Sequence, residues 1–341
     1  MPTCPTSESE LDDVMSSPTE TVIETVRAHD GDFAVLGAAG KMGFHLCLML
    51  QRAVAALGRE HRQRVIAVSR FGSVRSKAEF EALGVGTIAC DLCSEESLCG
   101  LPEVPNVFFL AGVKFGTASD AELLQRMNVT MPAQVAERYA TSRIVALSTG
   151  CVYSFTPPES GGSREEDETD PPGDYARSCL GREEAFTRAS IQKGTRCSLI
   201  RLNYSIDLRY GVLMDIARKV STGEPVDVTM GYANVIWQGD ALAHTIQSLS
   251  HATSPPFILN VTGPGVLRVR DLAEAFGHHL EREPILVGKE EPTAWLNNAA
   301  KAHRLFEMSL DMMIAWTADW LKRGGTTLGK PTHFEKRDGN Y

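Results

Sequence analysis

The stretch FAVLGAAGKMG, at residues 33–43, determines the fold that the sequence predicts. An apolar run leads into Gly37, Gly40 and Gly43, and an apolar segment with helical spacing follows. Without side chains, the glycines let the backbone turn tightly and approach a pyrophosphate, whose charge the N-terminus of a helix stabilises. The stretch therefore predicts a strand, a dinucleotide-binding loop and a helix, and the alternative is a tight turn without a ligand.

Short apolar runs of the same kind recur along the chain, and amphipathic segments separate them. They lie at residues 65–68, 87–89, 107–110, 144–147 and 198–200. Apolar runs that alternate with helical patterns indicate parallel strands joined by crossover helices. We therefore expect an α/β fold, a Rossmann-type doubly wound parallel sheet with helices on both faces, followed by a smaller C-terminal substrate lobe.

The domain boundaries follow from shifts in composition. Residues 1–20 are rich in Ser, Thr, Pro and acids and are expected to form a disordered arm. We assign 21–203 to the dinucleotide-binding domain and 204–341 mainly to the substrate lobe, with a part near 232–262 returning to the first domain. Pro, Gly and acids crowd residues 155–174, which predicts a surface loop that covers a substrate or a partner, or else a solvated acidic insertion.

Composition narrows the class of protein. The net charge of -9 argues against a nucleic-acid partner, because binding to phosphates needs clustered Lys and Arg. The sequence has no apolar run of roughly 18 to 20 residues and no signal-like N-terminus, so we expect a cytoplasmic protein without a membrane partner. The cysteines are scattered, and Cys90, Cys93 and Cys99 lack a second ligand pair, so we expect reduced thiols and no metal site.

The end of the second expected strand bears on the choice of cofactor. A site for NAD commonly has Asp or Glu there, to bind the adenosine ribose. This chain has Ser69 and Arg70 instead, with Arg75 and Lys77 close behind. Because a guanidinium presents a planar set of donors to phosphate oxygens, NADP is the preferred cofactor, and NAD remains possible if Arg70 is only a solvated surface charge.

Several further motifs follow the glycine loop. Asp91 and Leu92 come after the third strand, and Leu110, Ala111 and Gly112 end the fourth; MNVTMPAQV contains Asn128, LSTGCVY spans 147–153, EDETDPPGDY ends at Tyr175, VIWQGDALA contains Asp240, and LNVTGP begins at Leu259.

In this spacing the chain, from about residue 33 to 306, resembles the extended short-chain dehydrogenase/reductase superfamily, of the NAD-dependent epimerase/dehydratase type. The resemblance implies hydride transfer at a hydroxyl or ketone carbon of a sugar, sugar acid or nucleotide-sugar, and a homodimer. It implies a Tyr that exchanges the hydroxyl proton, here Tyr175, and a Ser or Thr that holds the oxygen, here Thr149. Thr149 is alternatively a hydroxyl that satisfies the backbone at a strand end. The implied cofactor contacts are Gly37, Gly40, Lys41, Met42, Gly43, Ser69, Arg70, Asp91, Leu92, Leu110, Ala111, Gly112 and Tyr175.

The chain departs from the family pattern at one position. The family has YxxxK, in which Lys holds the nicotinamide ribose and lowers the pKa of the tyrosine, whereas this chain reads YARSC and has Cys179 there. A thiol supplies neither the charge nor several donors. Lys114, near the end of the fourth strand, and Arg182, seven residues after Tyr175, are the candidate replacements, with Lys114 slightly preferred. Each is alternatively an ordinary surface cation.

Two functions from different classes remain open at this stage. Retention of the tyrosine, a hydroxyl residue and the other motifs favours an active dehydrogenase or epimerase. The missing Lys favours a dinucleotide-binding sensor or regulatory protein that has lost the chemistry.

Overall fold

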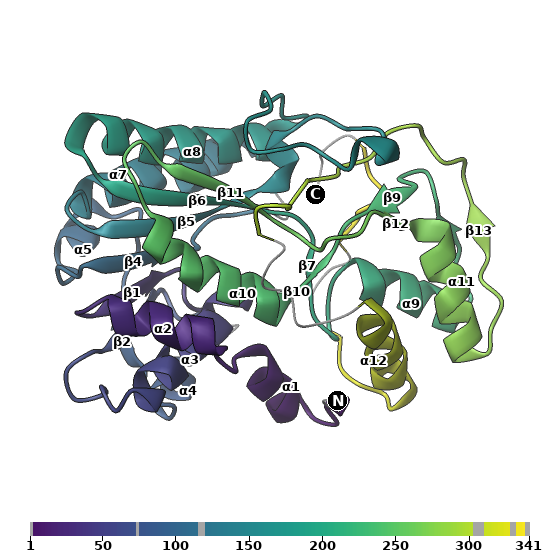
Figure 1. Ribbon diagram of the computed structural model, residues 1–341, viewed down its shortest axis with the longest axis horizontal. Helices are drawn as coiled ribbons and strands as arrows, with labels where there is room; N and C mark the ends of the chain where they lie inside the picture. The colour runs from purple at the N-terminus through teal and green to yellow at the C-terminus, as the bar shows by residue number, and fades with distance from the viewer. Residues whose placement is uncertain (1–2, 73–74, 115–119, 303–309, 328–331, 338–341) are drawn as a thin grey trace.

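A seven-stranded parallel sheet forms the centre of the protein (Figure 1). The computed structural model describes residues 3–72, 75–114, 120–302, 310–327 and 332–337. The strand order is β11-β6-β5-β4-β1-β2-β3. Successive strands are added on one side of β1 as far as β3 and on its other side from β4 onward, so the strand order reverses between β1 and β4. This order confirms the Rossmann-type doubly wound sheet, in which ligands bind at the carboxyl ends of the strands near the reversal.

The strands begin and end close to the apolar runs of the sequence. They are β1 (Phe33–Leu36), β2 (Val65–Ser69), β3 (Gly86–Ala89), β4 (Asn106–Phe109), β5 (Arg143–Thr149), β6 (Arg196–Leu202) and β11 (Phe257–Val261). The sequence analysis placed six of these and did not identify β11 as a strand. β11 pairs with β6 from Phe257↔Ser198 to Val261↔Leu202, far along the chain from the other strands.

Helices cover both faces of the sheet, because alternate strand residues point to opposite sides. Phe33 and Val35 of β1 pack with α2 (Glu20–Ala28), α3 (Lys41–Ala56) and α10 (Gln238–Gln247) on one face. Ala34 and Leu36 pack on the other face with α7 (Met131–Arg138) and α8 (Asp174–Lys193), which lie above the sheet in Figure 1. Shorter helices, α4 (Lys77–Glu81), α5 (Glu95–Cys99) and α6 (Ala121–Gln125), follow β2, β3 and β4.

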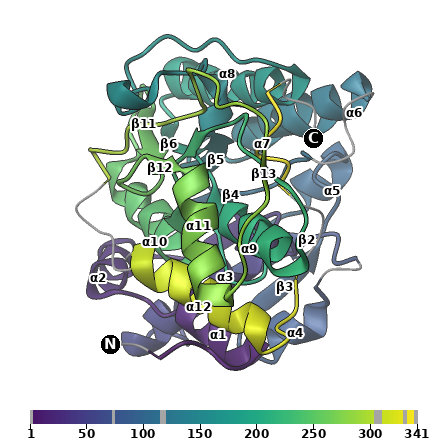
Figure 2. The same ribbon diagram turned by 90° about the vertical axis from the view of Figure 1, so that its right-hand side faces the viewer.

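A second apolar core lies beside the carboxyl ends of the strands. The helices α9 (Val212–Thr222), α11 (Val269–Leu280) and α12 (Leu310–Lys322) surround it, as Figure 2 shows, with buried Phe276 and Trp316 among its residues. Its strands have two residues each and form two-stranded sheets, in which β7 pairs with β10, β9 with β12 and β8 with β13. These strands are β7 (Ser205–Ile206), β8 (Val226–Asp227), β9 (Tyr232–Ala233), β10 (Ile236–Trp237), β12 (Leu267–Arg268) and β13 (Leu286–Val287).

The expectation of a disordered arm was wrong for the N-terminal segment. Residues 3–20 contain α1 (Glu8–Met15), and Ser7 caps this helix by accepting a hydrogen bond from the Glu10 amide. Leu11 and Met15 are fully buried in the second core. The polar composition of this segment gave the wrong expectation. A helix this short is only marginally stable alone and is stabilised by packing of its apolar face against the rest of the protein, which amino-acid composition does not reveal.

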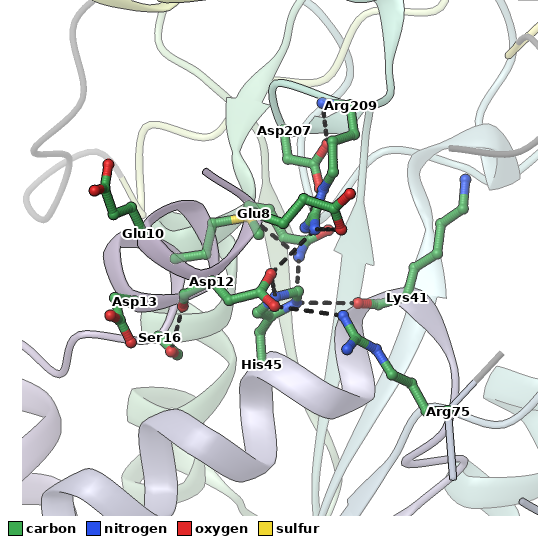
Figure 3. Close-up of polar contacts among 12 residues, drawn as sticks. Glu8, Glu10, Asp12, Asp13, Ser16, Lys41, His45, Arg75, Asp207 and Arg209 are labelled. Carbon is green, nitrogen blue, oxygen red and sulfur yellow. Dashed lines mark hydrogen bonds and ion pairs between the residues drawn. The ribbon is translucent and has the colours of Figure 1, made fainter. Parts of the chain in front are cut away.

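Asp12 of α1 joins three separate parts of the chain (Figure 3). Its carboxylate lies 2.8 Å from His45 Nε2 on α3, 3.5 Å from Arg75 Nη2 after β2, and 3.1 Å from Arg209 Nη1 beside the second core. Burial opposes ionisation of Asp12, but the hydrogen bond and charge of His45, with the Arg209 and Arg75 guanidinium groups, hold the pKa of the carboxyl below its usual value. The N-terminal helix therefore ties the two cores together electrostatically.

Asp12→Ala is expected to lower the free energy of unfolding by about 2–3 kcal/mol at pH 7, because it leaves the buried Arg209 with fewer acceptors. A carboxyl with a lowered folded pKa stabilises above its unfolded pKa and ceases to do so as it protonates, so the difference from the parent should shrink below about pH 4. Urea denaturation across pH measures both. The matched control is Asp13→Ala, whose side chain is 62% exposed and should cost less than about 1 kcal/mol. Equal losses in the two variants would contradict the role of Asp12.

Among the described residues, no helix combines the length and apolarity needed to span a membrane.

Candidate active site

The glycine loop connects β1 to α3. It lies at the carboxyl end of β1, next to β4, where the strand order of the sheet reverses. The Gly37 amide donates to the Val68 carbonyl at 2.9 Å, and the Gly40 amide donates to the Gly37 carbonyl at 3.1 Å, which closes a tight turn. Gly40 is the N-cap residue of α3 and provides no side-chain cap. The first amides of this 16-residue helix are therefore available to an anion, which the helix dipole also favours.

The three glycines have different roles. Gly37 has a φ of +89°, and a Cβ there would lie 2.6 Å from the Ala111 amide nitrogen; a Cβ on Gly43 would lie 2.6 Å from the Ala38 carbonyl oxygen. A Cβ on Gly40 would meet only the Gly37 carbonyl oxygen, at 3.3 Å. Gly37 and Gly43 are thus required by backbone packing, whereas Gly40 leaves open the space in front of the helix.

A cavity of about 400 Å³ lies in front of this loop. Nine of the residues that the sequence analysis assigned to the cofactor line it: Gly37, Gly40, Ser69, Arg70, Asp91, Leu92, Leu110, Ala111 and Gly112. Sequence reasoning missed the rest of its lining, which is Ala39, Phe71, Gly72, Cys90, Cys93, Met127 and Met131. Most of these residues are sequence neighbours of residues that had been assigned. Their position just after the ends of β2 and β3 is the feature of the sequence that could have identified them. Gly43 lies beneath the loop, outside this lining.

The basic residues after β2 separate in the structure. Arg70 is exposed at the edge of the first cavity. Arg75 instead bonds to Glu79 at 2.9 Å and to Asp12 at 3.5 Å, and its guanidinium carbon lies 4.0 Å from the centre of the Phe44 ring. Arg75 is thus engaged by the N-terminal helix, and Arg70 is the arginine that faces the cavity.

A second cavity, of about 250 Å³, adjoins the first near the ends of β4 and β5. Lys114, Thr149 and Tyr175 line it, as do Lys41 and Met42, which the resemblance had assigned to the cofactor. Its other lining residues were not anticipated: Ser148, Cys151, Leu202, Asn203, Tyr204, Ser205, Tyr210, Gly211, Val212, Gln238 and Thr332. Several of these lie in the segment from 202 to 212. Its first residues belong to the motif IRLNY at 200–204, which resembles a landmark of the family's smaller lobe and was not assigned to the site.

The environment of Tyr175 favours the protonated phenol. Burial, Cys179 and Cys151 raise the pKa of Tyr175 well above its usual value, against the opposing charge of Arg182. Cys179 is fully buried, and its thiol lies near enough to the Tyr175 phenol to contribute to the raised pKa of the phenol. A tyrosine in this state keeps its proton near neutral pH, so it needs additional positive charge nearby to form the phenolate and exchange a proton with a substrate.

The structure distinguishes the two candidate cations. Lys114 Nζ lies 5.5 Å from the centre of the Tyr175 ring, and burial lowers the pKa of this lysine. Arg182 is buried, and it donates to the Leu147 carbonyl at 2.9 Å and to Asn128 Oδ1 at 2.8 Å. Arg182 therefore braces the end of β5 against α8 and acts on Tyr175 only through its charge.

Thr149 serves the backbone and also faces the second cavity. Its hydroxyl oxygen accepts a hydrogen bond from the Cys151 amide at 3.2 Å, which is the structural role that the sequence left open. Because a hydroxyl that accepts one bond still has its proton to donate, this contact is compatible with a role toward a substrate oxygen.

Within the described residues, no cluster of three or more His, Cys, Asp or Glu is arranged to hold a metal ion.

Solved structures with the same fold were found by comparison. MoeE5 in complex with UDP-glucose and NAD is 19% identical, with a TM-score of 0.67 over 86% of this chain and 99% of that one. The UDP-glucose 4-epimerase of Thermus thermophilus, in complex with NAD, is 18% identical, with a TM-score of 0.69 over 85% and 99%. The UDP-glucuronic acid 4-epimerase of Bacillus cereus, in complex with NAD, is 16% identical, with a TM-score of 0.68 over 86% and 99%.

The sequence comparisons identify a family. No curated protein sequence matches the chain. Residues 33–228, more than half of the chain, match the NAD dependent epimerase/dehydratase family, and they include the glycine loop, Thr149 and Tyr175. The chain therefore belongs to the NAD-dependent epimerase/dehydratase family.

Proposed function

We propose that this protein is a nicotinamide-dependent dehydrogenase or epimerase that acts on a hydroxyl or ketone carbon of a sugar, sugar acid or nucleotide-sugar. The observation that supports it is that residues next to one another in the chain line the two cavities. Gly40 and Gly112 line the first cavity, whereas Lys41 and Lys114, one and two residues further on, line the second. A dinucleotide in the first cavity would meet a substrate in the second at this boundary.

The residues present fit a dinucleotide. The uncapped N-terminus of α3 and the open space at Gly40 suit the pyrophosphate, and when bound the nicotinamide supplies or accepts hydride. In this proposal the Tyr175 hydroxyl exchanges a proton with the substrate oxygen, and the Thr149 hydroxyl holds that oxygen in place. Lys114 supplies the positive charge that stabilises the phenolate, in the role that the family gives to the Lys at the position of Cys179.

The similar structures agree with a sugar-type substrate. They include MoeE5 in complex with NAD and either UDP-glucose or UDP-glucuronic acid, and a UDP-glucose 4-epimerase in complex with NAD. Sugar hydroxyls need hydrogen-bond partners, and the second cavity offers the hydroxyls of Tyr204 and Ser205, which have no partner among the described residues.

A sensor or regulatory protein is the second candidate, and the state of Tyr175 favours it. With Cys179 four residues after the tyrosine and a pKa well above the usual value, the phenolate is scarcely formed near neutral pH. A protein of this kind would bind the dinucleotide without turning over a substrate.

Turnover distinguishes the two candidates. The purified protein is incubated with NAD or NADP and a panel of sugars, sugar acids and nucleotide-sugars, and the absorbance of the reduced nicotinamide is followed. Because an epimerase returns the hydride, exchange of carbon-bound deuterium is measured in parallel. Signal in either assay supports the enzyme, and silence in both with intact cofactor binding supports the sensor.

Arg70→Ala is expected to weaken NADP binding by about 10- to 100-fold and NAD binding little, since a guanidinium at the cavity edge offers charge-assisted bonds to a 2′-phosphate. Calorimetric titration with each cofactor measures the difference. The matched control is Arg62→Ala. Arg62 is exposed and follows the C-terminal end of α3, whereas the glycine loop precedes its N-terminal end, so this substitution should change neither affinity. A parent protein that prefers NAD, or equal losses for both cofactors, would contradict a 2′-phosphate contact.

A further inference from the structure

The backbone of Tyr204 has a conformation that tyrosine rarely adopts. Tyr204 lies between β6 and β7, and its φ of +39° is in the left-handed region. A bulky residue in this region carries a conformational cost and persists only where the surrounding structure fixes it. Such residues gather at functional sites, and Tyr204 lines the second cavity.

The main chain on both sides of Tyr204 is fixed by hydrogen bonds. The Asn203 amide donates to the Val261 carbonyl of β11 at 3.0 Å. The Tyr204 carbonyl accepts from the Ile236 amide of β10 at 3.2 Å. The side chain of Asn203 is held as well, because its Nδ2 donates to Asn234 Oδ1 at 3.0 Å. These bonds fix the direction in which the Tyr204 side chain leaves the backbone.

The ring and the hydroxyl of Tyr204 have different surroundings. The half-buried side chain packs against the second apolar core. The hydroxyl oxygen is buried and has no hydrogen-bond partner among the described residues. Burial raises the pKa of the phenol well above its usual value, and Cys151, Glu335 and Tyr210 act in the same direction. Packing therefore explains the ring, whereas the hydroxyl is a neutral group for which the described residues supply no partner.

Ser205 repeats this situation at the next position. It lines the same cavity, and its Oγ is buried without a hydrogen-bond partner in the described part of the chain. Its backbone is also fixed, because Ser205 of β7 pairs with Ile236 of β10. Buried polar groups are nearly always hydrogen-bonded in folded proteins. Two adjacent hydroxyls without partners, in the cavity that Thr149 and Tyr175 also line, therefore indicate that a ligand supplies the missing bonds.

We propose that Tyr204 and Ser205 are substrate-binding residues, whose hydroxyls bond to an oxygen of the substrate while its reacting carbon lies at Tyr175 and Thr149. This inference rests on the proposed function and adds two specificity-determining residues to it. Each hydroxyl can donate one bond and accept others, which matches the hydroxyl groups of a sugar. Because this contact is made away from the reacting carbon, it stabilises the bound substrate and the transition state alike.

Tyr204→Phe separates a role in binding from a role in folding, because it removes the hydroxyl and keeps the ring. Since no hydrogen bond within the described residues is lost, the variant is expected to have a Tm equal to or above that of the parent. The contrasting variant is Tyr153→Phe. The Tyr153 hydroxyl donates to Asn260 Oδ1 at 3.0 Å and accepts from Arg201 Nη1 at 2.6 Å, so its removal should lower the Tm. Thermal unfolding without added sugar measures both.

Kinetics with the best substrate of the panel measure the binding role. Tyr204→Phe and Ser205→Ala are each expected to raise KM by about 5- to 15-fold and to leave kcat nearly unchanged. Tyr175→Phe should show the opposite pattern, since it removes the proton exchange and lowers kcat. The matched control is Tyr139→Phe, whose phenol is outside the lining of both cavities and should leave KM unchanged. For a sugar that binds without turnover, calorimetric titration of the cofactor-saturated protein makes the same comparison through Kd.

Three results would overturn this inference and leave the proposed function intact. One is a KM equal to that of the parent in both Tyr204→Phe and Ser205→Ala. Another is a Tm lowered in Tyr204→Phe as far as in Tyr153→Phe, which would show that a buried water or another protein group satisfies the hydroxyl. The third is a kcat lowered as far as in Tyr175→Phe, which would make Tyr204 a catalytic residue. Failure of every sugar to bind to the parent or react would instead remove the proposed function as well.

Discussion

Gly40→Val is expected to weaken dinucleotide binding at least about a hundredfold while the protein remains folded. A Cβ at this position meets only one atom, the Gly37 carbonyl oxygen at 3.3 Å, so the fold tolerates it. The isopropyl group would fill the space in front of the uncapped amides of α3, where a pyrophosphate needs to approach. Loss of two charge-assisted hydrogen bonds there corresponds to at least this factor.

The measurement is calorimetric titration of NAD and NADP, with a thermal unfolding curve for each variant. Gly43→Ala provides the contrast, because its Cβ would lie 2.6 Å from the Ala38 carbonyl oxygen and 2.7 Å from Ala38 Cα. We expect that variant to lose stability, since backbone must move to make room. Binding of both cofactors to Gly40→Val as tightly as to the parent would show that the glycine loop is not the pyrophosphate site.

Tyr175→Phe is expected to lower kcat by about 10²–10⁴-fold with little change in cofactor affinity, because it removes only the hydroxyl that exchanges the proton. The phenol of Tyr175 lines the second cavity, so the ring is retained and the cavity keeps its shape. Activity is measured with the best substrate of the panel, by nicotinamide absorbance or by deuterium exchange. Full activity in Tyr175→Phe would exclude the tyrosine as the acid or base.

The pH–rate profile identifies the cation that assists Tyr175. Burial and Cys179 raise the pKa of the phenol, so any loss of nearby positive charge raises it further and the phenolate then forms only at higher pH. Lys114→Met should therefore lower activity and shift the profile to more alkaline pH. Cys179→Ala retains both cations and is the contrasting variant: because Cys179 raises the pKa of the phenol, any shift of its profile should be toward lower pH. An unchanged profile in Lys114→Met would assign the charge to another group.

Arg182 needs a different experiment. Arg182 is buried and donates to the Leu147 carbonyl and to Asn128 Oδ1, which also accepts from the Val113 amide. Arg182→Ala would remove both of these bonds and would report on folding as much as on chemistry. Arg182→Lys keeps the charge and is the informative substitution. If the protein is a sensor, no variant restores turnover except Cys179→Lys, which places a cation on the tyrosine's face of α8.

The sequence by itself determined every strand of the seven-stranded sheet except β11, and most of the lining of the first cavity. Parallel strands are apolar on both faces and local in sequence, so runs such as 33–36 and 65–68 coincide with strands from their composition alone. The residues that follow strand ends, among them Arg70, Asp91 and Gly112, come together in one cavity because the carboxyl ends of parallel strands meet at one edge. For these residues, the position after a predicted strand was enough to predict which cavity they line.

Only the tertiary structure decided the order at the N-terminus and the composition of the second cavity. Leu11 and Met15 order α1 by packing on residues such as Trp316, about 300 positions away, and no local pattern encodes that contact. Lys41 belongs by sequence to the glycine loop, yet its long side chain reaches Tyr210, because the second lobe packs against the start of α3. Which lysine faces which cavity depends on side-chain direction and on the packing of distant segments, and both are fixed only when the whole chain folds.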